Sequence, residues 1–431
     1  MLKAYRIELR RSPLLTAFPL MVAVDLLVLF GRSQYWIGVW PEASVAAQIV
    51  TLFLGPILAG VSAWQAGRSS RARVPEFLLS AARPGWRIEA TRLAATLTLG
   101  FVAYGVGCLT AAAVSLHDAG PGFLWPSYLL LGAATLIMFA SVGHLAGRWW
   151  PSAGFTPIVC ALGCFISMLA LPFRFEVLAG PPDTHLQVQP TVVRMLFALA
   201  LVVLAVTAPP RRRRAERETP FRRPSWHIKG AAVGALVCSL IALVEIPAAG
   251  ELSADRPASA NTPLCDRVNE STSRVCVWPE HRKYLPDLIR MAQRLGETGQ
   301  HQFKAPDTFY EYGLRRIELG DRGFDIAEGH VRTAAIAMAD QVFTESFGLC
   351  RPPVNEHRAL MAMDNIQLWL EYRAMGEDPA VADKGLHQEG VSAAQREATK
   401  AARMSPADQR KWVAHERSYL RENWCSPDER S

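Results

Sequence analysis

Long apolar runs fill the first 249 residues and are missing from the rest of the chain. A helix needs about 20 apolar residues to cross the hydrocarbon core of a bilayer. Seven segments meet or approach that length: approximately 13–31, 46–64, 93–116, 123–146, 153–171, 192–208 and 231–249. The fold class predicted for residues 1–249 is therefore an all-α polytopic membrane protein with about seven transmembrane helices.

The rest of the chain has the composition of a water-soluble domain. Residues 250–264 form a polar linker, and residues 265–431 are predicted to be a mainly helical α+β domain. The run Val275 to Trp278 is strand-like, and Pro279 suits the first turn of a helix. Ser405 and Pro406 similarly predict the cap and first turn of a last helix.

The first apolar run is too long for the core of a signal peptide, so we expect it to stay as a membrane anchor.

The connections between the apolar segments are alternately rich and poor in Lys and Arg. Four lie in residues 1–12 and six in the loop 65–92, whereas 117–122 contains none. Loops rich in Lys and Arg stay in the cytoplasm, so the N-terminus is expected inside and, after seven spans, the C-terminal domain outside. The net charge of +7 belongs to the membrane half, where about 22 Lys and Arg face about 11 Asp and Glu. It therefore indicates topology, and no nucleic acid partner is predicted.

The cysteines fit this topology. Four of the eight lie within the apolar segments, and the other four, Cys265, Cys276, Cys350 and Cys425, lie in the C-terminal domain. Four cysteines outside the cytoplasm suit two disulfides. Proximity favours Cys265–Cys276 and Cys350–Cys425, although three pairings stay open. The alternative, four free thiols in the cytosol, would require an even number of spans.

Motifs for catalysis are not found. The sequence contains no Walker A loop, no H-E-x-x-H zinc motif and no G-x-S-x-G elbow. The histidines of the C-terminal domain are scattered singly, without the spacing of metal ligands. We therefore predict no enzymatic activity and no catalytic, metal or cofactor-binding residue, while a metal site assembled only in three dimensions stays open.

Four ionisable residues fall inside apolar segments, where such groups are costly and often functional, and one of them, Arg194, lies at the outer end of the sixth segment. Asp25 lies near the middle of the first segment and could line a polar cavity, pair with another span or serve packing alone. His144 is interpreted as a boundary residue rather than a relay, and Glu245 as reaching the interface. Gly143 and Gly147 form a G-x-x-x-G pair, which suits packing within the bundle or a homodimer contact.

The loop 65–92 also contains a short amphipathic helix signal. Pro75 suits a first helical turn, Phe77 and Leu78 share a face, and the run Arg83 to Gly85 stops the helix. Residues 1–12 could be a helix on the membrane surface or a disordered basic start.

With these features the membrane half resembles permeases of the ABC transporter type-2 exporter class. That class has a short interfacial helix before its first span and a cytosolic coupling segment between its second and third. The segment here reads Arg71-Ala72-Arg73, Glu76-Phe77-Leu78-Leu79 and Arg83-Pro84-Gly85-Trp86, and Arg92 then enters the third span. The stretch VCVWPEHRKYLPDL resembles uncharacterised bacterial outer domains attached to such permeases. The seventh span and the outer domain depart from the six spans usual in the class.

The resemblance implies a permease subunit of an ATP-driven exporter in the bacterial plasma membrane. Its partners would be an ABC-type ATPase subunit, a second permease in a homo- or heterodimer, and the lipid bilayer. The implied docking residues are Pro75, Glu76, Phe77, Leu78 and Arg83. The alternative is a membrane-anchored receptor or interaction protein whose C-terminal domain binds a ligand or partner. The cargo leaves no signature in the spans.

Overall fold

The computed structural model describes most of the chain and divides it into two units, Met1–Ala254 and Asp255–Ser431. We call them the membrane unit and the C-terminal unit. The described residues are 2–31, 36–68, 85–170, 177–209, 226–248, 251–256, 263–270, 272–299, 302–315, 323–326, 330–348, 357–376 and 393–424.

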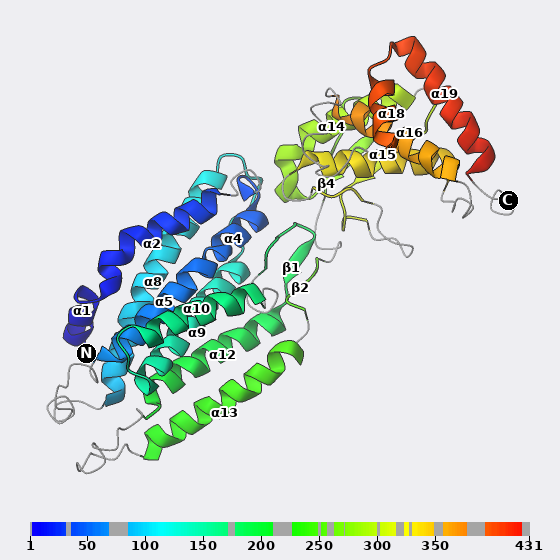
Figure 1. Ribbon diagram of the computed structural model, residues 1–431. Helices are drawn as coiled ribbons and strands as arrows, with labels where there is room; N and C mark the ends of the chain where they lie inside the picture. Colours follow the sequence, from blue (N-terminus) through cyan, green and yellow to red (C-terminus); the bar gives the residue numbers. More distant parts are fainter. Residues whose placement is uncertain are drawn as a thin grey trace. The chain divides into compact units, whose positions relative to one another are not determined.

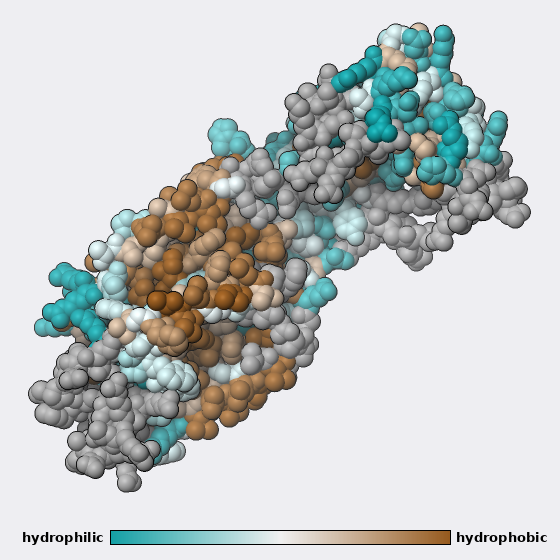
Figure 2. All heavy atoms as spheres, viewed as in Figure 1, coloured by the Kyte–Doolittle hydropathy of each residue, from teal (hydrophilic) through white to brown (hydrophobic). Residues whose placement is uncertain are grey.

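The membrane unit is a bundle of apolar helices (Figure 1). Its described helices are α1 (Leu2–Arg10), α2 (Pro13–Phe30), α4 (Trp40–Ile49), α5 (Thr51–Ala66), α8 (Gly85–Ser115), α9 (Pro126–Trp149), α10 (Phe155–Ala170), α12 (Val188–Thr207) and α13 (Trp226–Ala248). Five stretches are long and apolar enough to cross a membrane, namely α2, α4 with α5, α8, α9 and α12, while α10 and Trp226–Ile241 of α13 are shorter apolar helices. Apolar side chains cover much of the visible bundle surface (Figure 2). The coarse prediction of a helical first half with several helices long and apolar enough to cross a membrane is thus confirmed.

Several boundaries differ from the prediction. The second segment, predicted at 46–64, begins at Trp40 and is divided at Val50 into α4 and α5. Its earlier start follows from Pro41 in the first turn and from the Trp40 indole, whose Nε1 donates to the carbonyl oxygen of Gly120 at 2.8 Å. Helix α8 begins at Gly85, eight residues before the predicted segment, so Glu89 and Arg92 lie inside it.

Close approach of backbones holds the centre of the bundle together. A methyl group at Gly143 would lie 2.0 Å from the carbonyl oxygen of Ala59, and one at Gly147 would lie 2.1 Å from that of Ala63. The G-x-x-x-G pair therefore packs α9 on α5 within the bundle, which confirms the first of the two roles considered for it. The first residues also form a helix: α1 packs on α8, where the Tyr5 hydroxyl lies 2.8 Å from the Thr98 hydroxyl.

The C-terminal unit combines helices with a small sheet. Strands β3 (Leu264–Asp266), β4 (Arg274–Val277) and β5 (Thr308–Tyr310) pair in that order, β3 antiparallel and β5 parallel to β4. The 3₁₀ helix η3 (Pro279–Tyr284) leads into α14 (Leu285–Gly299), and α15 (Val331–Phe347), α16 (His357–Met375), α18 (Ala393–Ala402) and α19 (Pro406–Asn423) follow. Outside this sheet, β1 (Thr184–Leu186) of the membrane unit pairs with β2 (Ser253–Asp255), which lies at the boundary between the two units.

Large side chains fill the core of this unit. Trp278, Phe309 and Phe324 are fully buried, as are the helix residues Leu288 and Met338. The predicted starts are confirmed: β4 covers most of the strand-like run, Pro279 opens η3, and the Ser405 hydroxyl accepts the backbone N–H of Asp408 at the start of α19. Strand β5 pairs with β4, about 30 residues earlier in the chain.

Candidate functional site

The residues predicted to dock an ATPase, Pro75, Glu76, Phe77, Leu78 and Arg83, lie outside the described residues. Their role stays a prediction. The structure does describe the helices on either side, because α5 ends at Ala66 and α8 begins at Gly85. We call the end of the bundle where α5 ends, α8 begins and α9 ends its proximal end. Buried polar side chains gather there.

Glu89 is the centre of this group. Its Oε1 accepts from Nη1 of Arg92 at 3.1 Å, one turn further along α8, and its Oε2 lies 3.0 Å from Nε2 of His144 on α9. The side chain of His144 is only 1% exposed. His144 lies five residues before the end of α9 at Trp149, and Glu89 meets its imidazole inside the bundle. Its interpretation as a boundary residue stays a prediction.

Arg148 extends the connection to a third helix. Its Nη1 donates to the carbonyl oxygens of Ala205 and Val206, at 2.6 and 3.1 Å, near the end of α12. Those carbonyls belong to the last turn of the helix, which leaves acceptors without an intrahelical partner and attracts cations. Arg148 thus joins α9 to α12 one helical turn after His144.

A second chain of hydrogen bonds links the start of α2 to α5 and α8. Ser12 caps α2 by accepting the N–H of Leu14, and its Oγ also accepts from Nε2 of Gln65 at 2.8 Å. The Gln65 Oε1 in turn accepts from the hydroxyl of Thr96 at 3.0 Å. We call these residues together the proximal network. Its members are Ser12, Gln65, Glu89, Arg92, Thr96, His144 and Arg148.

The electrostatics of the network make its members depend on one another. Removing one partner of a buried ion pair leaves an uncompensated charge and costs about 3–5 kcal/mol. Such pairs stabilise little compared with apolar packing, but they fix a particular arrangement of the helices that contribute to them. The network therefore sets how α8 sits against α9 at the point where the chain enters α8 from residues 69–84.

Asp25 is fully buried in α2, and neither carboxyl oxygen has a hydrogen-bond partner among the described residues. It faces Gly107 of α8, where a methyl group would lie 2.6 Å from Oδ2. Of the three roles considered, pairing with a polar group of another span finds no support among the described residues. Glu245 lies in α13, and its side chain is outside the described residues.

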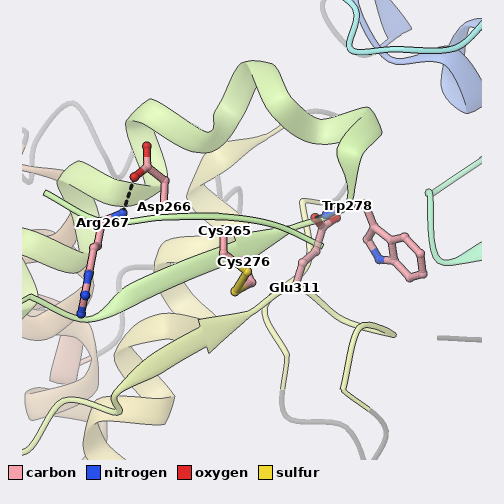
Figure 3. Close-up of a disulfide and its surroundings, with 6 residues drawn as sticks. All are labelled: Cys265, Asp266, Arg267, Cys276, Trp278 and Glu311. Atoms are coloured by element: carbon pink, nitrogen blue, oxygen red, sulfur yellow. Dashed lines mark hydrogen bonds between the residues drawn. A yellow bond between two sulfur atoms is a disulfide. The ribbon is translucent and has the colours of Figure 1, made fainter. Parts of the chain in front are cut away.

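Charged residues in the C-terminal unit are engaged in its core. His281 Nδ1 lies 2.5 Å from Oε1 of Glu311, whose Oε2 accepts the backbone N–H of Trp278 at 2.8 Å. Figure 3 shows Glu311 reaching Trp278 beside the disulfide. The Arg256 guanidinium stacks over the Trp278 ring and donates to Glu280 at 2.8 Å. These contacts attach η3 to the sheet. Within the described part of the chain, no three His, Cys, Asp or Glu side chains are grouped so as to hold a metal ion.

One of the two predicted disulfides is confirmed. Cys265 and Cys276 face each other across β3 and β4 and are bonded (Figure 3). Cys350 and Cys425 lie outside the described residues. Their nearest described neighbours meet, since Trp424 Nε1 donates to the carbonyl oxygen of Gly348 at 3.4 Å and the Trp424 ring packs edge-on against Phe343. The Cys350–Cys425 pairing stays a prediction.

The comparisons with known proteins concern the C-terminal unit. Residues 275–423 match the model of a family described as a domain of unknown function, DUF7224. The match covers most of the C-terminal unit and none of the membrane unit. No curated protein and no solved structure matches the chain.

Sequence reasoning missed most of the proximal network. It placed Glu89 in a loop and did not connect Glu89 or Arg148 with His144. One signal was available, because Glu89 and Arg92 are three residues apart and would be neighbours on a helix that began before residue 89.

Proposed function

We propose that the chain is the permease subunit of an ATP-driven ABC-type exporter in a bacterial plasma membrane, with its N-terminus in the cytoplasm and its C-terminal unit outside. A separate ATPase would dock on the segment within residues 65–92, and a second permease subunit would complete the pathway. The proposal is supported by the apolar helical bundle, by the coupling-segment pattern and by the distribution of basic residues.

The observation that carries the proposal is the position of the proximal network. Glu89 lies only four residues after the start of α8 and is paired with His144 of α9. A displacement of the segment preceding α8 would therefore act first on Glu89 and Arg92, and through them on α9. Packed helices that have two discrete arrangements can convert a small shift at one site into a helix rearrangement.

Docking is tested by copurification with a cognate P-loop ATPase, which would be sought among the genes that neighbour the one for this chain. Replacing Glu76→Arg together with Phe77→Asp should abolish copurification from detergent-solubilised membranes, because the double change reverses a charge and removes an apolar anchor. The matched control makes the same types of change at exposed positions of the C-terminal unit, Glu270→Arg with Val268→Asp. It should copurify as the parent does. Unchanged copurification of the first variant would refute docking at this segment.

Coupling is tested separately by Glu89→Gln in the assembled complex in liposomes. Glutamine keeps an acceptor for Arg92 but removes the charge shared with His144. We expect the ATPase to copurify normally, and the stimulation of ATP hydrolysis by the permease to fall at least about fivefold, the lower end of typical coupling between sites. Full stimulation would show that the network is structural only.

The receptor function is the second candidate, and one observation favours it. The C-terminal unit has its own buried core and a disulfide, and a family model matches it without the membrane unit. A domain of that kind can bind a partner on its own. Failure of any neighbouring ATPase to copurify with the parent chain, together with a kinase or sigma-factor regulator encoded beside it, would favour this function over transport.

A further inference from the structure

A pocket opens at the proximal end of the bundle, where α1 turns into α2 beside the end of α5. It has a volume of about 370 Å³. Three arginines line it, Arg10 and Arg11 from the end of α1 and Arg68 from just beyond α5. Its remaining wall includes Pro13, Leu15 and Trp64. The pocket is therefore cationic on one side and apolar on the other.

The arginines have no acidic partner. Among the described residues, no carboxylate lies within ion-pair distance of Arg10, Arg11 or Arg68, and all three are exposed. Like charges gathered around one pocket repel each other unless an anion lies between them. Guanidinium groups bind phosphate oxygens through paired N–H donors, which makes phosphate the anion this arrangement suits best.

The proximal network holds the pocket in shape. Ser12 lies in the pocket wall, and its hydroxyl is already engaged by Leu14 and Gln65. That double contact ties the α1–α2 junction, and with it Arg10 and Arg11, to α5 next to Arg68. The arginines are thus brought together by buried hydrogen bonds rather than by their own contacts, which reduces the entropy lost when an anion binds.

The apolar side of the pocket identifies the source of the phosphate. Leu15 is 49% exposed, and Leu20 and Leu27 are further exposed apolar side chains of α2. Trp64 belongs to a residue type that is enriched at membrane interfaces. A phosphate bound by the arginines would thus have an exposed apolar helix face beside it, as the acyl chains of a phospholipid require.

We propose that this pocket binds the headgroup of an anionic phospholipid, with Arg10, Arg11 and Arg68 on the phosphate and the acyl chains along α2. The site requires only that the bundle is embedded in a membrane, so it does not depend on the transport function. A lipid bound there would brace α1, α2 and α5 against one another at the end of the bundle that carries the proximal network.

The test is native mass spectrometry of the full chain in neutral detergent, titrated with phosphatidylglycerol or phosphatidylcholine. The parent should retain phosphatidylglycerol in preference. The triple variant Arg10→Gln, Arg11→Gln and Arg68→Gln should lose apparent affinity by about a hundredfold, since each basic group near a membrane surface contributes roughly a fivefold factor and the three factors multiply. Arg68→Gln alone, which leaves the α1–α2 junction intact, should lose about fivefold.

The matched control removes the same charge outside the pocket, through Lys3→Gln, Arg87→Gln and Lys229→Gln, all at exposed positions. It should keep the parent affinity within about twofold, as expected for screened charges at a distance. Equal losses in both triple variants, or no preference for phosphatidylglycerol in the parent, would refute the site. Displacement of the lipid by inorganic phosphate at equal concentration would assign the pocket to a soluble anion and overturn the lipid proposal.

Discussion

The two units of this chain solve the packing problem in different ways. In the membrane unit, helices approach through glycine, so that Gly143 and Gly147 of α9 touch the backbone of α5. In the C-terminal unit, the core is built from large side chains such as Trp278, Phe309 and Leu288. Lipid removes the hydrophobic drive between helices and leaves close contact as the main attraction, whereas water rewards the burial of large apolar area.

Charge, in contrast, is used in the same way in both units. Glu89 joins α8 to α9 in the membrane unit, and Arg332 with Glu371 joins α15 to α16 in the C-terminal unit. Glu311 likewise reaches His281 and the backbone of Trp278, about 30 residues earlier in the chain. Such pairs fix how distant elements sit against each other in either unit, so the difference between the units lies in their apolar packing. Substitutions at matched positions can test whether each unit depends on its own kind of contact.

The largest effect is expected at the glycine seam. Gly147→Val would push a branched side chain into the carbonyl of Ala63, which a methyl group alone would approach to 2.1 Å. Backbone cannot yield at such a distance without separating α9 from α5, so we expect a loss of about 5 kcal/mol or more. Fluorescence-detected size exclusion in detergent should show the folded peak lost.

The control for this seam is Gly163→Val on α10. An added methyl group there meets nothing within 4 Å, and the position is exposed. The folded peak should keep the parent height. A normal peak for Gly147→Val would mean that the α5–α9 contact tolerates separation, and the contrast between the two units would then lose its main support.

The next effect concerns the C-terminal core. Phe309→Ala removes a fully buried ring from β5 and leaves a cavity, which should cost about 3–5 kcal/mol. Ile336→Ala on α15 is the control, because that side chain is 43% exposed. Pulse proteolysis of the full chain in urea should show the midpoint of the C-terminal unit lowered by the first variant and nearly unchanged by the second. Equal shifts would argue against a core built on large side chains.

A smaller effect is expected from the disulfide between β3 and β4. The bond joins residues eleven apart, and replacing both Cys265 and Cys276 by serine removes a constraint worth about 3 kcal/mol in the unfolded chain. The urea midpoint should fall accordingly. Cys238→Ser, at an exposed position of α13, serves as the control and should leave the midpoint unchanged.

Peptide mapping without reductant extends this experiment to the second predicted pair. A linked peptide containing Cys350 and Cys425 would confirm the pairing that the contact of Trp424 with Gly348 supports. Ready labelling of both thiols in intact cells by a reagent confined to the cytosol would instead place the C-terminal unit inside and overturn the predicted seven-span topology.

Sequence alone predicted the parts of this fold that depend on local patterns. Apolar runs located the membrane helices, and Ser405 with Pro406 located the start of α19, because caps and hydrophobic length act over a few residues. Sequence alone did not predict the features that depend on contacts between residues far apart in the chain. The earlier start of α4 depends on Trp40 reaching Gly120, and β5 pairs in parallel with β4 across an intervening helix.

For the candidate site, too, the sequence indicated single residues but not the contacts between residues far apart in the chain. Asp25, His144 and Glu245 were singled out because ionisable residues in apolar segments are conspicuous. The partner of His144 was not predicted, since Glu89 is 55 positions away and only the packing of α8 on α9 brings the two together. The burial of Asp25 against Gly107 likewise depends on the contact of α2 with α8.

The smallest effect on stability is expected at a solvent-exposed pair, which belongs neither to the glycine contacts of the membrane unit nor to the core of the C-terminal unit. His117 Nδ1 lies 2.7 Å from Oδ1 of Asp118 in the loop after α8, and this hydrogen bond raises the pKa of His117 above its ordinary value. A raised pKa contributes stability below the ordinary value near 6.5, and that contribution is lost as the pH rises through the raised one. Exposed pairs are screened by solvent and contribute little. Asp118→Asn should therefore return the pKa of His117 toward its ordinary value in an NMR titration, while the unfolding midpoint stays the same from pH 5 to 8. If the unfolding midpoint of the parent changed with pH and that of Asp118→Asn did not, the His117–Asp118 pair would contribute to stability, as the buried pairs of the proximal network are expected to do.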